Sequence, residues 1–457
     1  MKPASAGKSL TPRRAQRRGA AFFALLLGLT VVLTACGGAA TATPPSGAAT
    51  APTKAATTAA AASTSATTTS SSAASTTTKV ASPSSSSATS ATSASTTRAA
   101  SPTTSGTAAA GATPNASSKI AGAYQGEADT LNGAGSTFVQ VLFSKWFDDY
   151  AKLTNVKVNY QGVGSGAGKK AITDQTVDFA ASDAFMTDAE LQAAEAKCGA
   201  TILHFPIALG AVVVTYNIPG LEQTKLKMDG DVIAGIFMGE ITKWNDAKIA
   251  AANPGVNLPN EDIVVVHRAD GSGTTDIFTS YLTAASSKWA GQIKSGTTVN
   301  WPVGIGANGN AGVAGELKNS PYSIGYVELA YANQNKLPVA DVKNKAGKFI
   351  TPSNAGVTAA ANAFAPTAPA DLRLKIVNAD GDAAYPIAGI TWVLVCPKQT
   401  DQAKAIALTR LLWWGLHEGQ AYNEGLDYAK VPDTFIVKEE QFINQITVNG
   451  QKAFPGK

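Results

Sequence analysis

Cysteine and histidine are scarce in this sequence, and their scarcity excludes several kinds of site. The 457 residues contain three cysteines and three histidines. The histidines are scattered, and no CxxC pair or Cys/His cluster occurs, so no spacing matches a metal-ligand set. We therefore expect neither a bound metal ion nor a cofactor.

The apolar run near the start of the chain, Ala20–Ala35, is shorter than the roughly 20 residues that a membrane-spanning helix prefers. It follows a segment, residues 1–18, that has six Lys and Arg residues and no acid. This combination is typical of an export signal. The sequence LTAC at Leu33–Cys36 resembles a bacterial lipobox, which predicts a signal peptide at residues 1–35 and a lipid on Cys36. A plain cleaved signal peptide with an incidental cysteine is the alternative.

Large apolar side chains are nearly missing from residues 36–127, which are mostly Ala, Ser, Thr, Pro and Gly. Such a segment cannot offset the entropy of ordering, so it is predicted to be disordered. As a flexible coil it would span about 50 Å root-mean-square. We interpret it as a tether between a membrane anchor and a folded part.

The part of the chain that is expected to fold also lacks an excess of positive charge. The whole chain has a net charge of +5, but ten of its 37 Lys and Arg residues and one of its 32 Asp and Glu residues precede residue 128. Residues 128–457 keep 27 basic and 31 acidic residues, a net charge of −4. This balance argues against a nucleic-acid binder, which would show a basic footprint. It also means that an anion site must work through local geometry rather than through an attractive overall field.

Two cysteines, Cys198 and Cys396, remain in the folded part if Cys36 carries the lipid. In an exported and oxidising setting they could form a disulfide. Their spacing alone leaves the pairing open.

Short apolar strands alternate with helical patterns, which predicts an α/β architecture with largely parallel sheets. Helices are predicted at residues 138–153, near 169–174 and at 400–425, where apolar residues recur at helical spacing. Strands are predicted at residues 156–162, 177–182, 204–217, 262–267, 323–329 and 388–395.

Four short segments rich in glycine and hydroxyl residues stand where a strand or loop meets a predicted helix. They are Asn132–Phe138 (NGAGSTF), Gln161–Gly168 (QGVGSGAG), Phe179–Phe185 (FAASDAF) and His267–Thr275 (HRADGSGTT). Helix N-termini bind anions, and in open α/β folds ligands gather beyond the carboxyl ends of strands. Each segment alone is also typical of an ordinary helix cap or turn. Four together favour a shared oxyanion site.

Three charged residues in these segments indicate what kind of anion would bind. Arg268 would supply the permanent positive charge, and Asp270 would fix its guanidinium plane. An ionised carboxylate accepts hydrogen bonds only, so Asp183 would repel a fully deprotonated anion. Phosphate still carries a proton to donate, whereas sulfate at neutral pH has none. Asp183 would therefore select phosphate over sulfate.

At these residues the chain resembles the phosphate-binding proteins of phosphate-specific (Pst) ABC transporters. GAGSTF, KVNYQGVGSGAG, VDFAASDA, HRADGSGTT and IGYVELAYANQNKL follow the family's order between about Leu131 and Pro432. The resemblance implies a two-domain periplasmic-binding-protein-like fold with a ligand cleft between the domains. Two crossing strands, near Phe205–Tyr216 and Tyr385–Val395, would join a first domain (residues 128–210 and 385–457) to a second (residues 211–384).

The same resemblance implies a ligand set for inorganic phosphate. The phosphate-binding residues would be Thr137, Phe138, Ser165, Asp183, Arg268, Ser272, Gly273 and Thr274, with Asp270 orienting Arg268. Two positions depart from the family pattern: Gly166 replaces a common second Ser, and Val139 replaces a usual Pro. Neither departure removes a ligand.

The function that this implies is a lipid-anchored, extracytoplasmic protein, acting as a monomer, that delivers phosphate to an ABC transporter permease. It would be a binder and not an enzyme. A binder of another tetrahedral oxyanion, such as sulfate or molybdate, is the first alternative, and Asp183 argues against it. An exported phosphatase would need a base or metal ions beside a Ser or Thr nucleophile, and no cluster of His or acidic residues lies near the four segments. The third alternative is a surface adhesin that keeps the fold only for display.

Overall fold

The computed structural model of the chain describes residues 119–456. Cys36, the predicted signal peptide and nearly all of the predicted tether lie outside the described residues. The prediction of a disordered tether is wrong for its last residues, 119–127, which pack on the fold: Ile120 is buried and its amide donates to Oε1 of Glu418 at 2.8 Å, and Glu127 pairs with Arg410 at 3.0 Å. The strands are β1 (Thr130–Gly135), β2 (Lys157–Gly162), β3 (Phe179–Ser182), β4 (Leu203–Asn217), β5 (Lys227–Met228), β6 (Val264–Arg268), β7 (Ile305–Ala307), β8 (Ser323–Glu328), β9 (Asp341–Lys343), β10 (Phe349–Ile350), β11 (Ala388–Val395), β12 (Lys398–Gln399), β13 (Thr447–Val448) and β14 (Gln451–Lys452).

Helices separate most of these strands. They are α1 (Gln140–Thr154), α2 (Ser165–Thr173), α3 (Asp188–Cys198), α4 (Gly230–Phe237), α5 (Ala247–Ala252), α6 (Gly273–Ala285), α7 (Ser287–Gln292), α8 (Gly309–Asn319), α9 (Leu329–Asn335), α10 (Asn354–Phe364), α11 (Gln402–Leu416) and α12 (Asp433–Ile443), with 3-10 turns η1 (Ala365–Thr367), η2 (Glu418–Tyr422) and η3 (Glu424–Leu426). Within residues 119–456, none of the helices has the length and apolar character needed to cross a bilayer.

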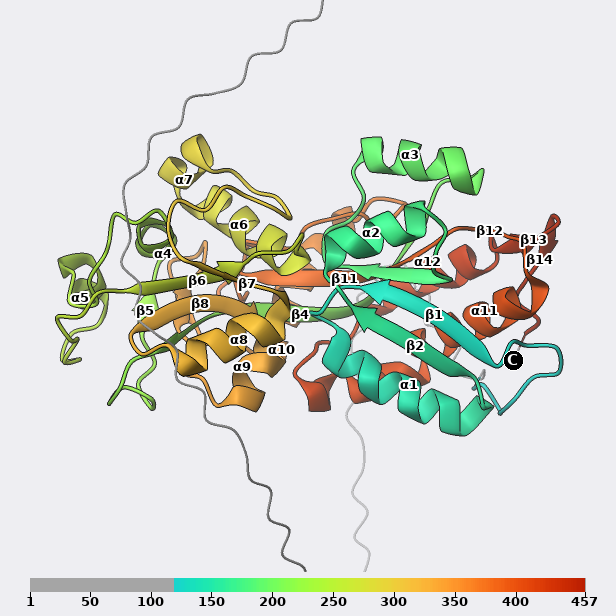
Figure 1. Cartoon of the computed structure of the whole chain (residues 1–457), viewed down its shortest axis with the longest axis horizontal. Helices are drawn as coiled ribbons and strands as arrows, with labels where there is room; N and C mark the ends of the chain where they lie inside the picture. The colour runs from blue at the N-terminus through green and yellow to red at the C-terminus, as the bar shows by residue number, and fades with distance from the viewer. Residues whose placement is uncertain (1–118, 457) are drawn as a thin grey trace, which may run out of the picture. The chain divides into compact units, whose positions relative to one another are not determined.

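One eight-stranded sheet, in the order β2-β1-β3-β11-β4-β8-β6-β7, organises the described chain (Figure 1). The first flank, β2-β1-β3, is parallel, and so is the second flank, β8-β6-β7. The expected α/β class is confirmed. The expectation of a largely parallel sheet holds for the flanks but not for the centre, where β3-β11, β11-β4 and β4-β8 are antiparallel.

The antiparallel centre arises because β4 and β11 carry the chain between the two flanks in opposite directions. Residues 203–211 of β4 pair with β11, and residues 212–217 pair with β8. A single strand of 15 residues thus pairs with β11 along its first part and with the second flank along its last part, and it matches the strand predicted at residues 204–217 to within one residue. In Figure 1 the segments at the start and end of the described chain, β1 and α11, accordingly lie together at one end of the sheet.

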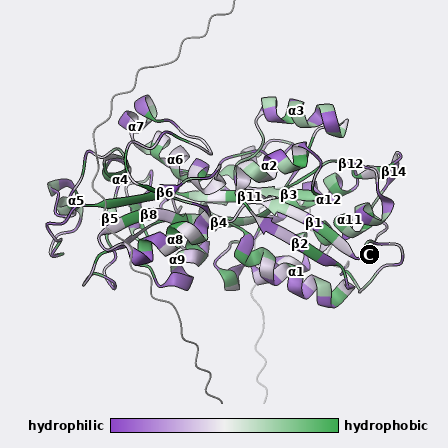
Figure 2. Cartoon of the chain, in the orientation of Figure 1, coloured by the Kyte–Doolittle hydropathy of each residue, from purple (hydrophilic) through white to green (hydrophobic). Residues whose placement is uncertain are grey.

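The centre of the sheet is also the most deeply buried part of the fold. Every residue of β11 is buried, and only the two end residues of β4 are partly exposed. Figure 2 shows hydrophobic residues concentrated along β6 and β11, while the helices alternate hydrophobic and hydrophilic residues. Burial of apolar area, at about 25 cal/mol per Å², therefore stabilises the strands that join the flanks.

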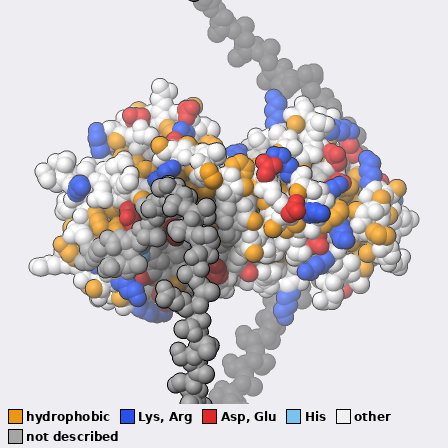
Figure 3. All heavy atoms as spheres, turned by 180° about the vertical axis from the view of Figure 1, so that it is seen from behind, with side chains coloured by type: hydrophobic (Ala, Val, Ile, Leu, Met, Phe, Trp, Pro, Cys, Tyr) orange, Lys and Arg blue, Asp and Glu red, His pale blue; other side chains and the backbone are white. Residues whose placement is uncertain are grey.

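Charged side chains of both signs are interspersed on the face seen in Figure 3. Most described ion pairs join neighbouring surface groups, such as Lys145 with Asp149 at 2.7 Å. Exposed pairs of this kind each stabilise a fold by about 0–1 kcal/mol. The mixture agrees with the absence of a basic footprint in the sequence.

Several predicted elements match closely. Strand β11 has the predicted bounds, β2, β3, β6 and β8 differ from prediction by a few residues at most, and α1 begins two residues later than expected. Helix α2 begins at Ser165 rather than near residue 169. Strand β1 was not predicted at all.

Two glycines explain why β1 was missed. Glycine is normally depleted in strands, so TLNGAG looks like a loop. In the structure a Cβ atom on Gly133 would lie 2.4 Å from the Phe179 ring, and one on Gly135 would lie 2.0 Å from the carbonyl oxygen of Ala181. Both glycines are needed because the Phe179 ring and the Ala181 backbone of β3 occupy the space that their side chains would fill.

Helix α11 ends nine residues before the predicted end at residue 425. His417 leaves the helical conformation, with φ −112° and ψ −86°, and the chain continues as 3-10 turns. The side chain of Gln420 folds back and donates a hydrogen bond to the carbonyl oxygen of Gly415 at 2.9 Å. This contact satisfies a carbonyl group that the helix end leaves without a backbone partner.

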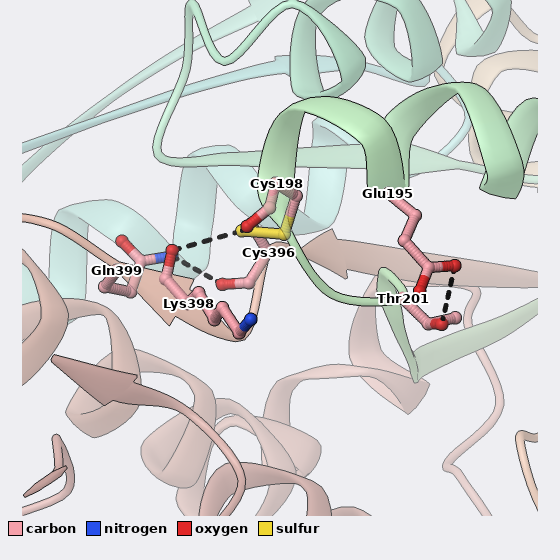
Figure 4. The surroundings of a disulfide bond; sticks show 6 residues. All are labelled: Glu195, Cys198, Thr201, Cys396, Lys398 and Gln399. Carbon is pink, nitrogen blue, oxygen red and sulfur yellow. Dashed lines mark hydrogen bonds between the residues drawn. A yellow bond between two sulfur atoms is a disulfide. The ribbon is translucent and has the colours of Figure 1, made fainter. Parts of the chain in front are cut away.

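Cys198 and Cys396, whose pairing the sequence left open, form a disulfide between the end of α3 and the residue after β11 (Figure 4). The bond closes a loop across a sequence separation of 198 residues. Nearby, Gln399 donates a hydrogen bond to the carbonyl oxygen of Cys396 at 2.6 Å. The disulfide thus ties the outer helix of the first flank to a central strand.

We predict that replacing both cysteines, Cys198→Ser with Cys396→Ser, lowers the free energy of unfolding by about 2–5 kcal/mol, because the long closed loop is lost from the unfolded state. Denaturant titration of the oxidised protein against the double variant measures the difference. A reductant should destabilise the unsubstituted protein and leave the variant unchanged. Equal midpoints for the two oxidised proteins would contradict the prediction.

Candidate functional site

The four glycine- and hydroxyl-rich segments meet at the carboxyl ends of β1, β2, β3 and β6. In the first flank, Gly135 pairs with both Gly162 and Ala181, so three strands end side by side. The second flank reaches this edge at the start of α2, where the amide of Gly166 donates to the carbonyl oxygen of Gly271 at 2.8 Å. Residues from all four segments therefore form one cluster.

Asp183, directly after β3, is the buried carboxylate of this cluster, with 3% of its surface exposed. It accepts hydrogen bonds from the hydroxyls of Ser136, at 2.6 and 2.7 Å, of Thr391, at 2.7 Å, and of Ser165, at 3.2 Å. The backbone amide of Asp183 in turn donates to the Ser165 oxygen at 3.1 Å. Three hydroxyl groups from three different elements thus point at one carboxylate.

Burial raises the pKa of Asp183 to about 6, against an ordinary value of 3.8. The hydrogen bonds from Ser136 and Thr391, the charge of Arg268 and the hydrogen bond from Ser165 all act in the opposite direction. The carboxylate is therefore only partly compensated for its loss of water.

Arg268, the last residue of β6, is the buried cation, with 3% of its surface exposed. Its Nε atom donates to Oδ1 of Asp270 at 2.7 Å, and its Nη2 atom pairs with Oδ2 of the same carboxylate. The amide of Gly309 also donates to Asp270, at 3.0 Å. Burial would raise the pKa of Asp270, but the hydrogen bonds and charge of Arg268 hold it below its ordinary value. Two-point pairing fixes the guanidinium plane, as the sequence predicted for Asp270.

The N-terminus of α6 lies directly against Asp183. Ser272 caps this helix by accepting from the amide of Thr275 at 3.0 Å, which leaves its hydroxyl proton to donate elsewhere. A Cβ atom on Gly273 would lie 2.5 Å from Oγ of Ser165 and 2.7 Å from Oδ2 of Asp183. Only glycine fits here, so the N-terminus of α6 packs directly against the Asp183 carboxylate.

Thr137 and Phe138 lie between β1 and α1 and are both buried. The oxygen of the Thr137 hydroxyl accepts from the side chain of Asn310 at 3.0 Å, in the first turn of α8. The amide of Phe138 donates to the Ser136 hydroxyl at 2.9 Å. This amide, expected to face an anion, already has an acceptor in the structure.

All nine site residues predicted from the sequence belong to this one cluster. Three further members were not predicted: Ser136, Thr391 and Asn310. Thr391 left a signal in the sequence, because it is the single hydroxyl residue in the apolar strand β11. The pairing of β11 with β4 shifts register between Thr391 and Trp392, and such irregularities re-aim side chains. Asn310 left no signal, since its partner Thr137 is 173 residues away.

The three histidines lie outside this cluster. His204 accepts from the amide of Met186 at 3.1 Å, and burial lowers its pKa to about 4. His267 stacks on Trp301, and His417 pairs with Glu440. In residues 119–456, no group of three or more His, Cys, Asp and Glu side chains could hold a metal ion. The hydroxyls of the cluster thus contact a carboxylate but no histidine.

Comparisons with known proteins identify the family of this chain. The family model described as "PBP superfamily domain" matches residues 122–408. The phosphate-binding protein PstS of Xylella fastidiosa (strain 9a5c) is 40% identical over 320 residues, which cover 70% of this chain and 86% of that protein. The phosphate-binding protein PstS of Pasteurella multocida (strain Pm70) is 41% identical over 313 residues, covering 68% and 89%.

A solved structure shows the same fold. A high affinity periplasmic phosphate-binding protein (PfluDING), bound with phosphate at pH 8.5, superimposes with a TM-score of 0.57 and 23% identity. The alignment covers 68% of this chain and 93% of that one. The fold is therefore the two-domain periplasmic-binding-protein fold.

The pKa of Asp183 predicts how stability depends on pH. A carboxyl whose pKa is raised by folding binds more protons in the folded than in the unfolded protein between about pH 4 and pH 6. The contribution of Asp183 to the free energy of unfolding is fully present below about pH 4 and is lost as the pH rises through about 6. In buffer without oxyanions, the unsubstituted protein should lose roughly 3 kcal/mol relative to Asp183→Asn across this window. Denaturant titrations of both proteins at several pH values measure this, and parallel pH profiles would contradict it.

Proposed function

The chain belongs to the family of the phosphate-binding proteins PstS within the PBP superfamily, and from this premise we propose that it binds inorganic phosphate outside the cytoplasm and delivers it to an ABC transporter permease. It acts as a binding protein and not as an enzyme, and it needs no cofactor. The observation that carries the proposal is the cluster in which buried Asp183 faces the N-terminus of α6 beside the paired Arg268.

In this proposal each ligand group of the cluster has a separate role. Arg268, oriented by Asp270, provides the positive charge, and Asp183 accepts a hydrogen bond from a phosphate hydroxyl. The remaining ligands are donors: the hydroxyls of Thr137, Ser165, Ser272 and Thr274, and the backbone amides of Phe138 and Gly273. The amide of Phe138 exchanges the Ser136 oxygen for a phosphate oxygen. A dehydrated anion needs this many donors because it has lost its water.

The proposed domains are residues 128–210 with 385–457, and residues 211–384. The change of partner along β4, from β11 to β8 between Ala211 and Val212, supports this division. Phosphate touches ligands from both domains, so it favours the closed arrangement over an open one. Closure about the two crossing strands then couples binding to recognition by the permease.

The proposal also includes the membrane attachment. Cys36 carries a lipid, and residues 37–118 tether the folded part, a monomer, to the outer face of the cell membrane. The LTAC sequence at Leu33–Cys36 and the composition of the tether support this part.

The proposal is tested by calorimetry with phosphate, sulfate and molybdate on protein purified without added phosphate. Phosphate should bind far more tightly than the other two, since only phosphate has a proton for Asp183. Tighter binding of sulfate or molybdate would overturn the assignment of the anion. Turnover of a chromogenic phosphate ester would instead establish the phosphatase alternative.

Asp183→Asn is predicted to weaken phosphate binding by about 10- to 100-fold, because a hydrogen bond to a charged group is lost, and to narrow the preference for phosphate over sulfate. Calorimetry with both anions measures the affinities. Glu195→Gln, which also replaces a carboxylate by an amide but at an exposed position of α3, is the matched control. It should leave the affinity for phosphate and the preference over sulfate unchanged. Unaltered selectivity in Asp183→Asn would remove Asp183 from its proposed role.

Arg268→Ala is predicted to abolish measurable binding at low phosphate concentration. The variant loses the buried cation and leaves Asp270 as an uncompensated carboxylate. Together these changes should lower the affinity for phosphate by at least about 100-fold. Equilibrium binding of radioactive phosphate measures the effect. Tight binding by this variant would move the site elsewhere in the protein.

A further inference from the structure

Asn310 joins two of the proposed phosphate ligands that come from different flanks of the sheet. It lies in the first turn of α8 and is fully buried. Its single Nδ2 group donates to Oγ1 of Thr137 at 3.0 Å and to Oγ1 of Thr274 at 3.1 Å. Both hydrogens of the side-chain amide are therefore used on threonine oxygens.

The orientation of this amide is fixed by a third contact. Oδ1 of Asn310 accepts from the backbone amide of Glu328 at 3.0 Å, at the end of β8. A backbone amide can only donate, so the oxygen of the side chain must face Glu328. The nitrogen must then face the two threonines.

Each threonine oxygen also receives a second donor. Oγ1 of Thr137 accepts from the backbone amide of Asn310 at 3.1 Å, and Oγ1 of Thr274 accepts from Nη1 of Arg268 at 3.2 Å. A hydroxyl group has two acceptor lone pairs and one proton to donate. Both oxygens are therefore saturated as acceptors, and the amide and guanidinium groups around them cannot accept. Each hydroxyl can form one further hydrogen bond only by donating its proton.

We propose that Asn310 is a positioning residue for anion binding, which fixes the hydroxyls of Thr137 and Thr274 as donors to unprotonated anion oxygens. This inference rests on the proposed function, since it assumes that phosphate contacts both threonines. Asn310 does not touch the anion itself. It sets the direction of two protons that would otherwise rotate, and so removes the cost of ordering them on binding.

The arrangement has a consequence for the protonation state of the ligand. Threonine oxygens that are saturated as acceptors cannot receive a hydrogen bond from a protonated phosphate oxygen. These two threonines therefore offer no acceptor to a second phosphate proton, so they favour the anion with one proton over the anion with two. Removing Asn310 frees the threonine oxygens to accept and relaxes this preference.

Asn310→Ala should weaken phosphate binding by about 10- to 100-fold, the range expected when charge-assisted hydrogen bonds are lost. The loss should be larger near pH 8.5 than near pH 7, where the doubly protonated anion is more abundant and the pH is still above the pKa of Asp183, about 6. Asn310→Asp keeps the side-chain shape and the contact to the Glu328 amide, but it accepts from both threonines and should weaken binding further. Calorimetry measures the affinities, and thermal unfolding confirms that each variant is folded.

Two asparagines near α8 provide matched controls. Asn319→Ala makes the same deletion at an exposed position of this helix, and Asn308→Asp adds the same charge at its exposed N-cap. Both should change the affinity for phosphate by less than about 3-fold. An equal loss in Asn308→Asp and Asn310→Asp would attribute the effect to charge alone and overturn the inference.

A double-mutant cycle separates positioning from a merely structural role. In the background of Thr137→Val with Thr274→Val, no hydroxyls remain to be oriented, so Asn310→Ala should cost less than about 3-fold. Additive losses would show that Asn310 acts on the fold and not through these protons. If the unsubstituted protein fails to bind phosphate, the proposed function itself is wrong. Normal binding by folded Asn310→Ala would overturn only the role of Asn310.

Discussion

The close approach of α6 to Asp183 is the constraint on which the rest of the site depends. No side chain fits at Gly273, because a Cβ atom there would overlap with Ser165 and with the Asp183 carboxylate. This contact requires that β3 and β6, from opposite flanks of the sheet, end at the same place. The antiparallel pair β4 and β11 makes that possible. It lies between the two flanks, whose strands run in opposite directions, so the carboxyl ends of those strands face one another.

The close approach also buries the Asp183 carboxylate, and much of the nearby polar structure compensates for its lost hydration. Ser136, Ser165 and Thr391 each donate to Asp183, yet its pKa is still raised to about 6 by burial. A fold selected only for stability would have no use for such a group. In the proposed function this group selects the ligand, because a carboxylate accepts a hydrogen bond from an anion that still has a proton and repels an anion that has none.

The sequence was sufficient to predict the elements whose signals are local and the residues that the structure brings together in one cluster. Strand β11 and helix α1 follow from apolar periodicity, and the site residues follow from four segments that resemble one family. Strand β1 was missed because Gly133 and Gly135 serve a close approach to β3, which only the folded sheet reveals. Helix α11 was predicted too long because its end depends on a contact from Gln420.

The members of the cluster that could not be predicted share one property. Ser136, Thr391 and Asn310 contact other polar side chains of the site, and these contacts connect residues from distant parts of the chain. Serine and asparagine are ordinary at a turn and at a helix start, and only Thr391 stands out, as the single hydroxyl residue of β11. Whether a buried hydroxyl donates or accepts depends on the complete set of its neighbours, which no spacing along the sequence records.

The charges of the site explain why these neighbours matter so much. Arg268 is the one cation described in the cluster, and Asp183 and Asp270 are both carboxylates, so the ionised cluster has a net charge of −1. The folded part of the chain is itself negative, at −4. Neither the cluster nor the surrounding protein therefore attracts an anion by net charge. In the proposed function, affinity for phosphate therefore comes from dipoles with fixed directions: the amides of the α6 N-terminus and the hydroxyls of Thr137 and Thr274, whose protons Asn310 orients. Since these dipoles are donors and Asp183 is an acceptor, the same geometry would both bind the anion and discriminate between its protonation states.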